Sequence, residues 1–366
     1  RALRRGIRVV TRRLVVVAEP DDKRARSLDA AMERAGLCRP LYVPWTDVLH
    51  DPSQLQHIGS PGDFLRVESP GSDPKTWHLL AQRGGFDGTL TDGQWRPGRA
   101  FFVGLQRALA DICRATPQLI PTHPAQHILT MTDKLWCAQH LQQHHIATPQ
   151  TDDAPQSVEA LRAQLHKQRR YAVFVKPRWG SSAAGVMAYR FRPNEEQLIT
   201  TARLVDGQLV NEKRLHVYRD SASISVLLQT ILSDGAVVQR WIPKAATSGG
   251  PFDVRVLMIA GQLAQRVARV GNGAITNLHI DAKRMSAEEA LDSVGPHVAD
   301  RVYFVCQQVA DSFPGQLVLG IDVMVDAAGR PFVIECNAWG DYLPKLLHHG
   351  QDSYDSQVHA MFGTAA

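Results

Sequence analysis

Apolar and polar positions in the first third of the chain alternate between short strand-like runs and amphipathic helical stretches. Short apolar runs predict strands, at 14–18, 41–44 and 64–69. Apolar residues spaced three and four positions apart predict helices, at 24–35 and 100–114. Strands that alternate with helices indicate a parallel sheet. The pattern therefore predicts a small α/β domain over residues 14–120.

Beyond residue 120 the pattern predicts further strands and helices around one loop rich in glycine and serine. Helices are predicted from Thr132–Asp133 to about His145, over 157–167 and over 297–311. Strands are predicted at 171–176 and 186–190, with the glycine/serine loop 178–185 between them and a hairpin at 320–337.

Composition excludes several classes of protein. Hydrophobic residues make up 44% and charged residues 21% of the 366 positions, which is ordinary for a globular chain and argues against disorder, collagen or coiled coil. No apolar run approaches about 18 residues, so we expect no membrane-spanning helix. Five scattered cysteines without a C-x-x-C pair fit neither a zinc site nor a disulfide framework. The expected setting is reducing and cytoplasmic.

Positive charge is concentrated at the start of the chain. The net charge is +5, but residues 1–13 hold six arginines and no acid, so the remaining chain has a net charge of −1. We therefore expect a solvated basic arm over 1–13 and no specific nucleic-acid partner for the folded body. Contact between the arm and a polyanion or an acidic membrane is the alternative.

The segment that follows the strand at 171–176 has the composition of a phosphate-binding loop. The strand ends in Lys176, and the loop after it contains Gly180, Ser181, Ser182 and Gly185. Small residues let backbone N–H groups approach phosphate oxygens, and a lysine fixed at a strand end adds positive charge. The segment lacks the G-x-x-x-x-G-K-[ST] pattern of a P-loop. A surface turn beside an incidental lysine is the alternative.

Two acidic residues interrupt the apolar strands of the predicted hairpin. With a four-residue turn after Asp326, Asp322 lies opposite Glu335, and Asn337 shares the face of Glu335. A shorter turn would shift this pairing. Carboxylates opposed on a buried face repel unless a cation lies between them. Oxygen ligands suit Mg²⁺ that bridges nucleotide phosphates, whereas the alternative is a hairpin whose acids point to solvent.

Cationic side chains fall at other positions suited to an anionic ligand. Lys134 begins a predicted helix, where its charge is unfavourable for the helix dipole unless an anion lies nearby. Arg255 and Arg269 lie on successive strands together with Asp253, and arginine binds phosphates and carboxylates through paired N–H groups. A solvated lysine and a salt-bridged sheet surface are the alternatives.

Taken in order, these residues resemble the ATP-grasp superfamily, and most of all the branch containing the ribosomal-protein glutamate ligase and bacterial glutathione synthetase. Residues 120–345 carry the resemblance. It implies an α/β fold with α+β lobes, divided into a pre-ATP-grasp α/β domain at 14–120, an ATP-grasp domain at 121–350 whose small lobe spans about 150–240, and a C-terminal tail at 351–366.

Four spaced motifs support the resemblance, and each is similar to a family motif. They are Thr132-Asp133-Lys134, the hinge 239–242, Asp253-Val254-Arg255 and Thr276-Asn277-Leu278-His279. The resemblance assigns cofactor binding to Lys134, Lys176, Gly180, Ser181, Ser182, Gly185, Gln239, Arg240, Trp241, Ile242, Asp253 and Asn277. It assigns metal ligation to Asp322, Glu335 and Asn337, and catalysis to Arg269 and Arg255. The implied cofactors are ATP and two Mg²⁺ ions, with Mn²⁺ as an alternative.

The sequence departs from the family at two points. Arg240 replaces the hinge acid, and Asn337-Ala-Trp-Gly340 lacks the proline of the family's Asn-x-x-Pro-Gly turn near the acyl substrate. The resemblance implies an ATP-dependent carboxylate–amine ligase that acts through an acyl phosphate, releases ADP and phosphate, and uses an amino acid or peptide carboxylate. A non-catalytic ATP-binding module and an ATP-grasp phosphotransferase are the alternatives. The expected partners are the carboxylate substrate and its amine acceptor. A homodimer is an alternative to a monomer.

Overall fold

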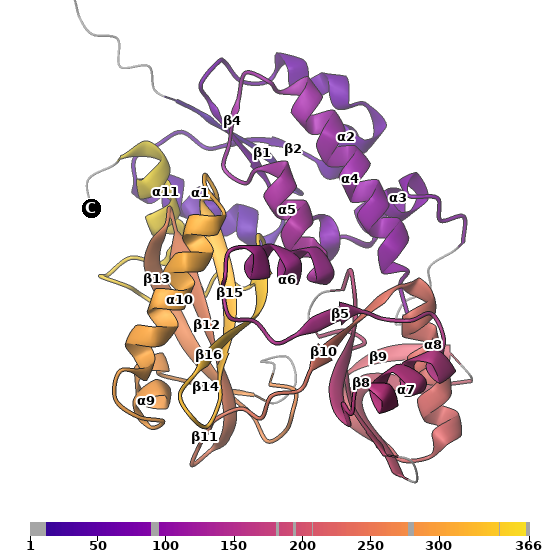
Figure 1. Ribbon diagram of the computed structural model, residues 1–366. Helices are drawn as coiled ribbons and strands as arrows, with labels where there is room; N and C mark the ends of the chain where they lie inside the picture. Colours follow the sequence, from indigo (N-terminus) through magenta and orange to yellow (C-terminus); the bar gives the residue numbers. More distant parts are fainter. Residues whose placement is uncertain are drawn as a thin grey trace, which may run out of the picture.

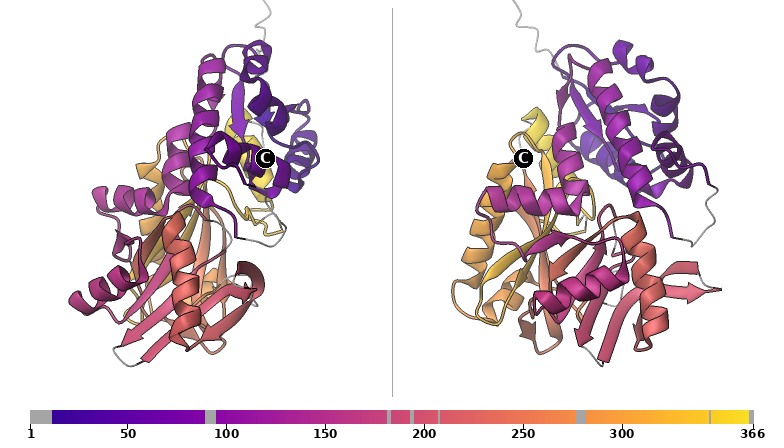
Figure 2. Two further views of the ribbon diagram at one scale, coloured as in Figure 1. Left: turned by 90° about the vertical axis from the view of Figure 1, so that its right-hand side faces the viewer. Right: turned by 45° about the vertical axis from the view of Figure 1, so that its right-hand side comes forward.

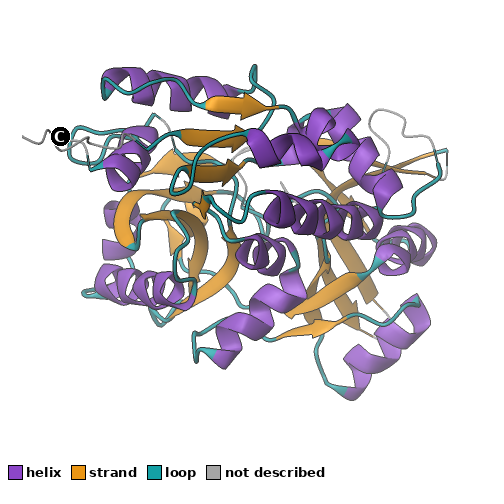
Figure 3. Ribbon diagram, turned by 90° about the horizontal axis from the view of Figure 1, so that it is seen from above, coloured by secondary structure: helices purple, strands orange, loops and turns teal. Residues whose placement is uncertain are grey.

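The computed structural model describes residues 12–88, 95–180, 183–192, 195–206, 208–276, 282–343 and 345–363. Within these ranges the strands form three sheets with helices packed around them, so the predicted α/β class is confirmed (Figure 1). In Figure 1 the N-terminal sheet lies at the top, the second sheet at the lower right and the third at the lower left. Figure 3 shows helices and strands intermixed throughout the molecule.

The N-terminal sheet is parallel, as the alternating pattern predicts. Its order is β2-β1-β3-β4, with β1 at Leu14–Val17, β2 at Leu41–Val43, β3 at Phe64–Val67 and β4 at Ile120–Pro121. Its helices are α1 (Lys23–Arg34), α2 (Trp45–His50), α3 (Pro74–Arg83), α4 (Gly98–Ala115) and the 3₁₀ turns η1 (Pro52–His57) and η2 (Pro70–Ser72). Helix α4 buries Phe102, Leu105 and Leu109 in the core because they recur at helical spacing.

The second sheet is antiparallel and has the order β5-β10-β6-β7-β8-β9. Its strands are β5 (Thr151–Asp153), β6 (Ala172–Pro177), β7 (Met187–Arg192), β8 (Glu195–Val205), β9 (Gln208–Tyr218) and β10 (Ala236–Arg240). Helices α7 (Val158–Lys167) and α8 (Ser221–Asp234) share its apolar core. The sequence analysis did not predict α8, although Ile224, Leu227, Leu228 and Ile231 form a helical stripe behind the capping residue Asp220.

The third sheet has the order β14-β13-β12-β15-β16, and β11 pairs with β12. Its strands are β11 (Ala246–Thr247), β12 (Gly250–Ile259), β13 (Gln262–Val270), β14 (Lys283–Met285), β15 (Val318–Val325) and β16 (Pro331–Asn337). Helices α5 (Ala125–Thr132), α6 (Lys134–Gln143), α9 (Ala287–Asp292) and α10 (Val298–Ser312) accompany it. The start predicted at Thr132–Asp133 is the junction of α5 and α6, where the buried Asp133 carboxylate caps α6.

Asp322 pairs with Glu335 as predicted, although the turn that connects their strands differs from the expected one. Val325, rather than Asp326, lies opposite Pro331, and a bulge between Asp322 and Val323 then restores the predicted partner. The Asp326 carboxylate instead accepts backbone N–H groups of the turn, at 2.9 Å from Ala328 N. The expected pairing is therefore present because two register differences offset each other.

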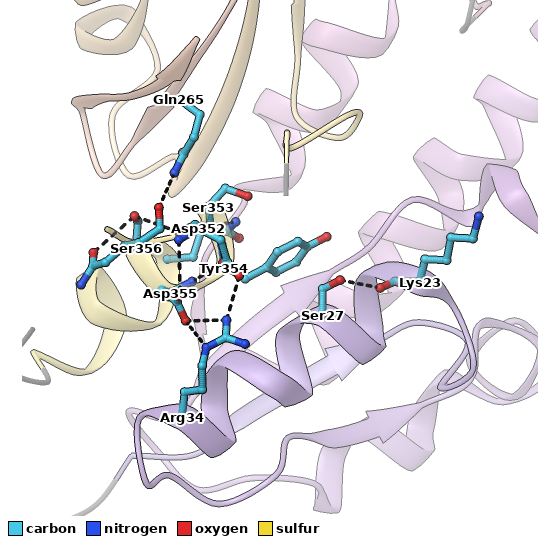
Figure 4. Close-up of polar contacts among 11 residues, drawn as sticks. Lys23, Ser27, Arg34, Gln265, Asp352, Ser353, Tyr354, Asp355 and Ser356 are labelled. Carbon is cyan, nitrogen blue, oxygen red and sulfur yellow. Dashed lines mark hydrogen bonds and ion pairs between the residues drawn. The ribbon is translucent and has the colours of Figure 1, made fainter. Parts of the chain in front are cut away.

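The C-terminal residues expected as a tail form helix α11 (Ser353–Phe362), which packs against α1. The carboxylates of Asp352 and Asp355 begin α11 in a capping box. Arg34 at the end of α1 forms ion pairs with both, at 2.8 and 2.6 Å (Figure 4). The two views in Figure 2 show this helix, in yellow, beside the N-terminal α/β region. The end of the chain therefore joins the third sheet to the N-terminal sheet.

The predicted basic arm lies mostly outside the described residues, which begin at Arg12. Arg13 contacts the body, since its backbone N–H donates to Asp63 at 2.8 Å and its guanidinium lies 3.3 Å from the same carboxylate. Arg12 stacks over the ring of Phe64 at 5.4 Å. Arg12 and Arg13, the last two residues of the predicted arm, are exposed to solvent and contact the body through these groups. Across the described chain, no helix is both long and apolar enough to cross a bilayer.

Candidate active site

A cavity of about 280 Å³ lies between the second and third sheets, and it gathers most of the site residues predicted from the sequence. Strands β6 and β10 form one wall, and strands β12, β13, β15 and β16 form the other. The predicted residues that line it are Lys134, Lys176, Gly180, Gln239, Arg240, Trp241, Ile242, Asp253, Arg269, Asp322 and Glu335. Segments more than 200 residues apart in the chain thus meet at one place.

Lys176 is held at the cavity wall by the adjacent strand. Its Nζ donates to Oε1 of Gln239 at 2.6 Å, and Gln239 donates onward to Oγ1 of Thr151 at 3.1 Å. Burial lowers the pKa of Lys176 to about 8 from an ordinary value of 10.5, and the neighbouring charge of Lys134 contributes in the same direction. A buried ammonium with one neutral acceptor is a favourable partner for an anionic ligand.

Lys134 faces Lys176 from the start of α6. Its Nζ lies 3.1 Å from Oε1 of Glu335 and donates to the carbonyl of Gly180 at 2.5 Å. Its backbone N–H donates to the carbonyl of Arg178 at 3.0 Å. The lysine is therefore fixed both to the metal-site candidate and to the base of the glycine loop.

The base of the glycine loop is anchored by one fully buried carboxylate. Asp133 accepts from Nε of Arg178 at 2.8 Å and from the indole N–H of Trp179 at 2.9 Å, while it caps α6. Its negative charge offsets the guanidinium beside it and holds α6 and the loop together. Sequence reasoning treated this aspartate only as part of a motif.

Gly185 lies in the predicted loop but does not line the cavity. Its φ is +65°, and a Cβ at this position would lie 2.6 Å from the ring of Trp95 and 3.0 Å from Ile231. Glycine is needed here for backbone conformation and close packing. Ser181, Ser182 and Asn277, which were predicted to bind the cofactor, lie outside the described residues.

Charged residues predicted on separate strands share one face of the third sheet. Arg255 lies opposite Asp322 and Asp253 lies opposite Arg269 in the strand ladder. Nη1 of Arg255 is 2.9 Å from Asp322, whose carboxylate also lies 3.2 Å from Nη2 of Arg269. Nε of Arg269 lies 2.6 Å from Asp253. Burial lowers the pKa of Arg269, but the nearby carboxylates, Asp253 foremost, raise it overall.

The expectation that Asp322 and Glu335 repel unless a metal separates them is corrected by these contacts. Asp322 has two guanidinium partners and Glu335 has Lys134. The carboxylates are therefore neutralised by side chains, and their burial alone does not require a cation.

The donor set still fits Mg²⁺. Asp322 and Glu335 are paired across the neighbouring strands β15 and β16. Asn337, which is on β16 with Glu335, lines the same cavity as both carboxylates. Among the described residues no cluster of three or more His, Cys, Asp or Glu side chains could hold a metal. Two carboxylates and one amide oxygen, completed by phosphate oxygens and water, match the usual Mg²⁺ site in nucleotide enzymes.

The opposite end of the cavity is apolar and is built around the hinge. The rings of Trp241 and Phe174 lie 5.1 Å apart, and the guanidinium of Arg190 lies 4.8 Å from the centre of the Trp241 ring. Met324 and Ile334 line the same cavity from the third sheet. Arg240 is exposed at the rim and forms none of these ring contacts.

Lys244 is a cavity residue that sequence reasoning missed. Its Nζ lies 2.6 Å from Oδ2 of Asp253 and also contacts Oγ1 of Thr276. Burial raises the pKa of Asp253, but Arg269 and then Lys244 lower it overall. The available signal was a lysine two residues after the hinge 239–242. The local pattern did not show that Asp253 and Thr276 would be its partners.

A second cavity of about 920 Å³ adjoins the first. The catalytic candidates Arg255 and Arg269 and the metal candidates Asp322, Glu335 and Asn337 line it. The N-terminal region supplies another part of its wall, from α1, η2, α3 and α4, and the remainder includes residues of α5, the glycine loop and the segment 338–341. The charged face of the third sheet is therefore open to a large space beside the smaller cavity.

The chain belongs to the YheC/D-like ATP-grasp family, whose model matches residues 129–359. The predicted membership of the ATP-grasp superfamily is thereby confirmed. No curated protein matches the chain in sequence.

Solved structures with the same fold extend over nearly the whole chain. D-cycloserine synthetase DcsG is 14% identical, with 96% of this chain and 99% of that chain covered and a TM-score of 0.58. The ATP-grasp ligase PsnB, complexed with a minimal precursor, is 15% identical, with 97% and 100% covered and a TM-score of 0.56. D-alanine–D-alanine ligase from Bacillus anthracis, complexed with ATP, is 13% identical, with 96% and 97% covered and a TM-score of 0.53. The N-terminal α/β region is thus part of the shared fold.

Proposed function

We propose that the protein is an ATP-dependent carboxylate–amine ligase that forms an acyl phosphate and releases ADP and phosphate. The observation that carries the proposal is that two cavities meet at one set of charged groups. Both cavities are lined by the charged residues Arg269, Asp322 and Glu335, and also by Gly180. ATP in the smaller cavity would present its terminal phosphate to a carboxylate in the larger one, and this proximity favours transfer.

The smaller cavity suits ATP at both ends. Trp241, Phe174 and Ile242 offer an apolar slot for adenine, and Lys134 and Lys176 offer ammonium groups for the phosphates. Phosphate oxygens would replace the acceptors that now hold these lysines, Glu335 and Gln239. Release of Glu335 from Lys134 would free its carboxylate for a metal. Mg²⁺ held by Asp322, Glu335 and Asn337 supplies positive charge that offsets the charge of the phosphates.

The chemistry follows from groups at the junction of the cavities. A substrate carboxylate oxygen attacks the γ-phosphorus, and ADP leaves. The amine nitrogen then attacks the acyl carbon, loses a proton, and phosphate leaves as the amide forms. Arg269 and Arg255 are the guanidinium groups that line the larger cavity beside Asp322, where they would stabilise negative charge on the transferring phosphoryl group and on the tetrahedral oxyanion.

We also propose the domain division that the sequence predicts. The N-terminal sheet uses strands up to Pro121, the second sheet spans Thr151 to Arg240, and the third begins at Ala246. These limits support a pre-ATP-grasp domain at 14–120 and a small lobe at about 150–240. Helix α11 then belongs with the body of the protein.

The test is to incubate the protein with ATP, Mg²⁺ and pooled amino acids or peptides, and to separate nucleotides and products. A ligase yields ADP, phosphate and a new amide in equal amounts. AMP with pyrophosphate would refute the mechanism. A phosphorylated product without an amide would assign a phosphotransferase, and Mg²⁺-dependent ATP binding without ADP release would assign a binding module.

A further inference from the structure

Both ends of the glycine loop contact the segment at the start of helix α4, which belongs to the N-terminal region. At the end of the loop, the benzene part of the Trp95 indole lies 2.6 and 2.9 Å from where a Cβ of Gly185 would stand. At the base of the loop, the rings of Trp179 and Phe102 are stacked with their centres 5.6 Å apart. The loop connects β6 to β7 in the small lobe, so these contacts join two separate parts of the fold.

Trp95 is itself fixed to the small lobe. Its backbone N–H donates to the carbonyl of Leu209 in β9 at 3.0 Å, and its side chain packs against the apolar core that the second sheet shares with α7 and α8. The indole N–H is buried and has no acceptor among the described residues. The side chain therefore contributes packing rather than a hydrogen bond.

A carboxylate of the small lobe holds the first turn of α4 in the same place. Asp234, at the end of α8, accepts from the backbone N–H of Gly98 at 2.7 Å and from that of Arg99 at 3.3 Å (Figure 1). Pro97 precedes α4 and provides no side-chain cap, so Asp234 takes the part of a capping residue from another element. A Cβ on Gly98 would lie 2.7 Å from the carbonyl oxygen of Trp179, which shows how closely α4 approaches the loop.

The loop residues between these two contacts line the smaller cavity. They are Gly180 and residues 183–184. Within the small lobe, the side chain of Asn211 accepts from the backbone N–H of Gly185 at 3.1 Å, and Trp95 adds an apolar contact to the same glycine. The position of this backbone decides where its N–H groups stand relative to a phosphate.

We infer that Trp95 is a positioning residue for ATP binding, which holds the turn at Gly185 and thereby the loop backbone that would meet the phosphates. The inference rests on the proposed function, because it takes ATP to be the ligand of the smaller cavity. Asp234 supports the contact by holding the segment 95–99. A loop that is not held would occupy its binding-competent position for only a fraction of the time, and the apparent affinity falls by that fraction.

The test measures two properties of the full chain and its variants. One is the affinity for a non-hydrolysable ATP analogue with Mg²⁺, by calorimetry, and the other is amide hydrogen exchange in peptides covering residues 183–192. Trp95→Ala should lower the affinity at least about tenfold and speed the exchange. Trp95→Phe should recover part of the affinity, because an aromatic ring remains beside Gly185. Phe304→Ala removes an exposed aromatic side chain from α10 and, as the control, should change neither property.

Titration with adenosine separates positioning of the loop from general damage to the lobe. Adenosine has the base and the sugar but no phosphate, so Trp95→Ala should leave its affinity unchanged. An equal loss for adenosine and the ATP analogue would overturn the positioning role. If Trp95→Ala does not fold, Asp234→Asn is the second variant, because it keeps the shape but weakens the cap of α4. It should lower the ATP-analogue affinity about threefold and speed the exchange, and no change in either would overturn the inference.

The outcomes also distinguish the inference from the proposed function. Unchanged affinity and exchange in Trp95→Ala overturn the role of Trp95, while amide formation by the wild-type protein would leave the ligase proposal standing. A wild-type protein that binds ATP but forms no amide would overturn the ligase proposal. A loss of ATP-analogue affinity in Trp95→Ala, with adenosine unaffected, would still support the positioning role in that case.

Discussion

The two cavities share a wall, yet the sequence predicted one of them far better than the other. The smaller cavity is lined by residues from motifs that stand together in the chain, above all by the whole hinge Gln239-Arg240-Trp241-Ile242. The larger cavity also takes the continuous run 337–341, but its N-terminal wall consists of residues scattered over α1, η2, α3 and α4. A nucleotide that is the same in every reaction favours a fixed local pattern. A substrate that differs between enzymes is met by dispersed side chains.

The first test of this contrast changes a residue that both cavities share. Glu335→Gln should lower Mg²⁺-dependent ADP formation by at least about a hundredfold, because the amide keeps the shape but removes a charge that would bind metal. Adenine contacts lie at the other end of the smaller cavity, so ATP affinity should fall much less. Nucleotide chromatography and calorimetry measure the two effects. Glu159→Gln, an exposed change on α7, is the control, and undiminished ADP formation in Glu335→Gln would remove the metal role.

The second test separates phosphate contact from general positive charge in the smaller cavity. Lys176→Ala should cost about 1.5–3 kcal/mol of ATP binding, roughly tenfold to a hundredfold in affinity, because it removes a buried charge-assisted contact. Lys167→Ala, an exposed change at the end of α7, should leave affinity unchanged. Calorimetric titration with ATP measures both. Equal affinities in the two variants would contradict a phosphate role for Lys176.

The third test acts on the larger cavity alone. Gly340 has a φ of +153°, and its Cβ would stand 2.6 Å from Nη2 of Arg255. Gly340→Ala should therefore displace Arg255 and lower turnover about tenfold, with little change in ATP affinity. Gly350→Ala is the matched control. Its φ of +80° also makes a side chain unfavourable for the backbone, but no neighbouring atom lies within 4 Å of the added Cβ. A parallel loss of ATP affinity would show that the cavities are not separable in this way.

Much of the fold and of the nucleotide site could be predicted because local patterns specify them. Strand β6 and the lysine at its end follow from an apolar run, and helix α4 follows from its apolar spacing. Helix α8 was missed, although its capping residue and its apolar stripe were visible in the sequence. The hairpin shows that a local pattern does not determine strand register. The predicted Asp322–Glu335 pairing is present only because of a bulge that no local signal marks.

Ion pairs across the third sheet could not be predicted because they depend on which strands are neighbours. Arg255 and Asp322 are far apart in the chain and meet only because β12 lies beside β15. The sequence therefore suggested a metal between Asp322 and Glu335, whereas the structure provides guanidinium and ammonium partners for them. Lys244 was missed for the same reason, since Asp253 and Thr276 approach it from other segments.

The smallest expected effect is a pH dependence that belongs to the smaller cavity. Burial lowers the pKa of Lys176 to about 8 in the free protein, so this lysine is charged below that pH and becomes neutral as the pH rises through it. ATP phosphates favour the charged form. ATP affinity should therefore be greatest below about pH 8 and should fall roughly eightfold between about pH 7.5 and about pH 9, where the ATP phosphates stay ionised.

Two measurements connect this pH dependence to Lys176 rather than to another group. Titrations in buffers of different ionisation enthalpy should show proton uptake on ATP binding above about pH 8, because the phosphates restore the ammonium. Lys176→Met should bind ATP weakly and with a nearly constant affinity over the same range, while Lys167→Met should retain the wild-type profile. A profile that is equally steep in Lys176→Met would assign the titration to another group.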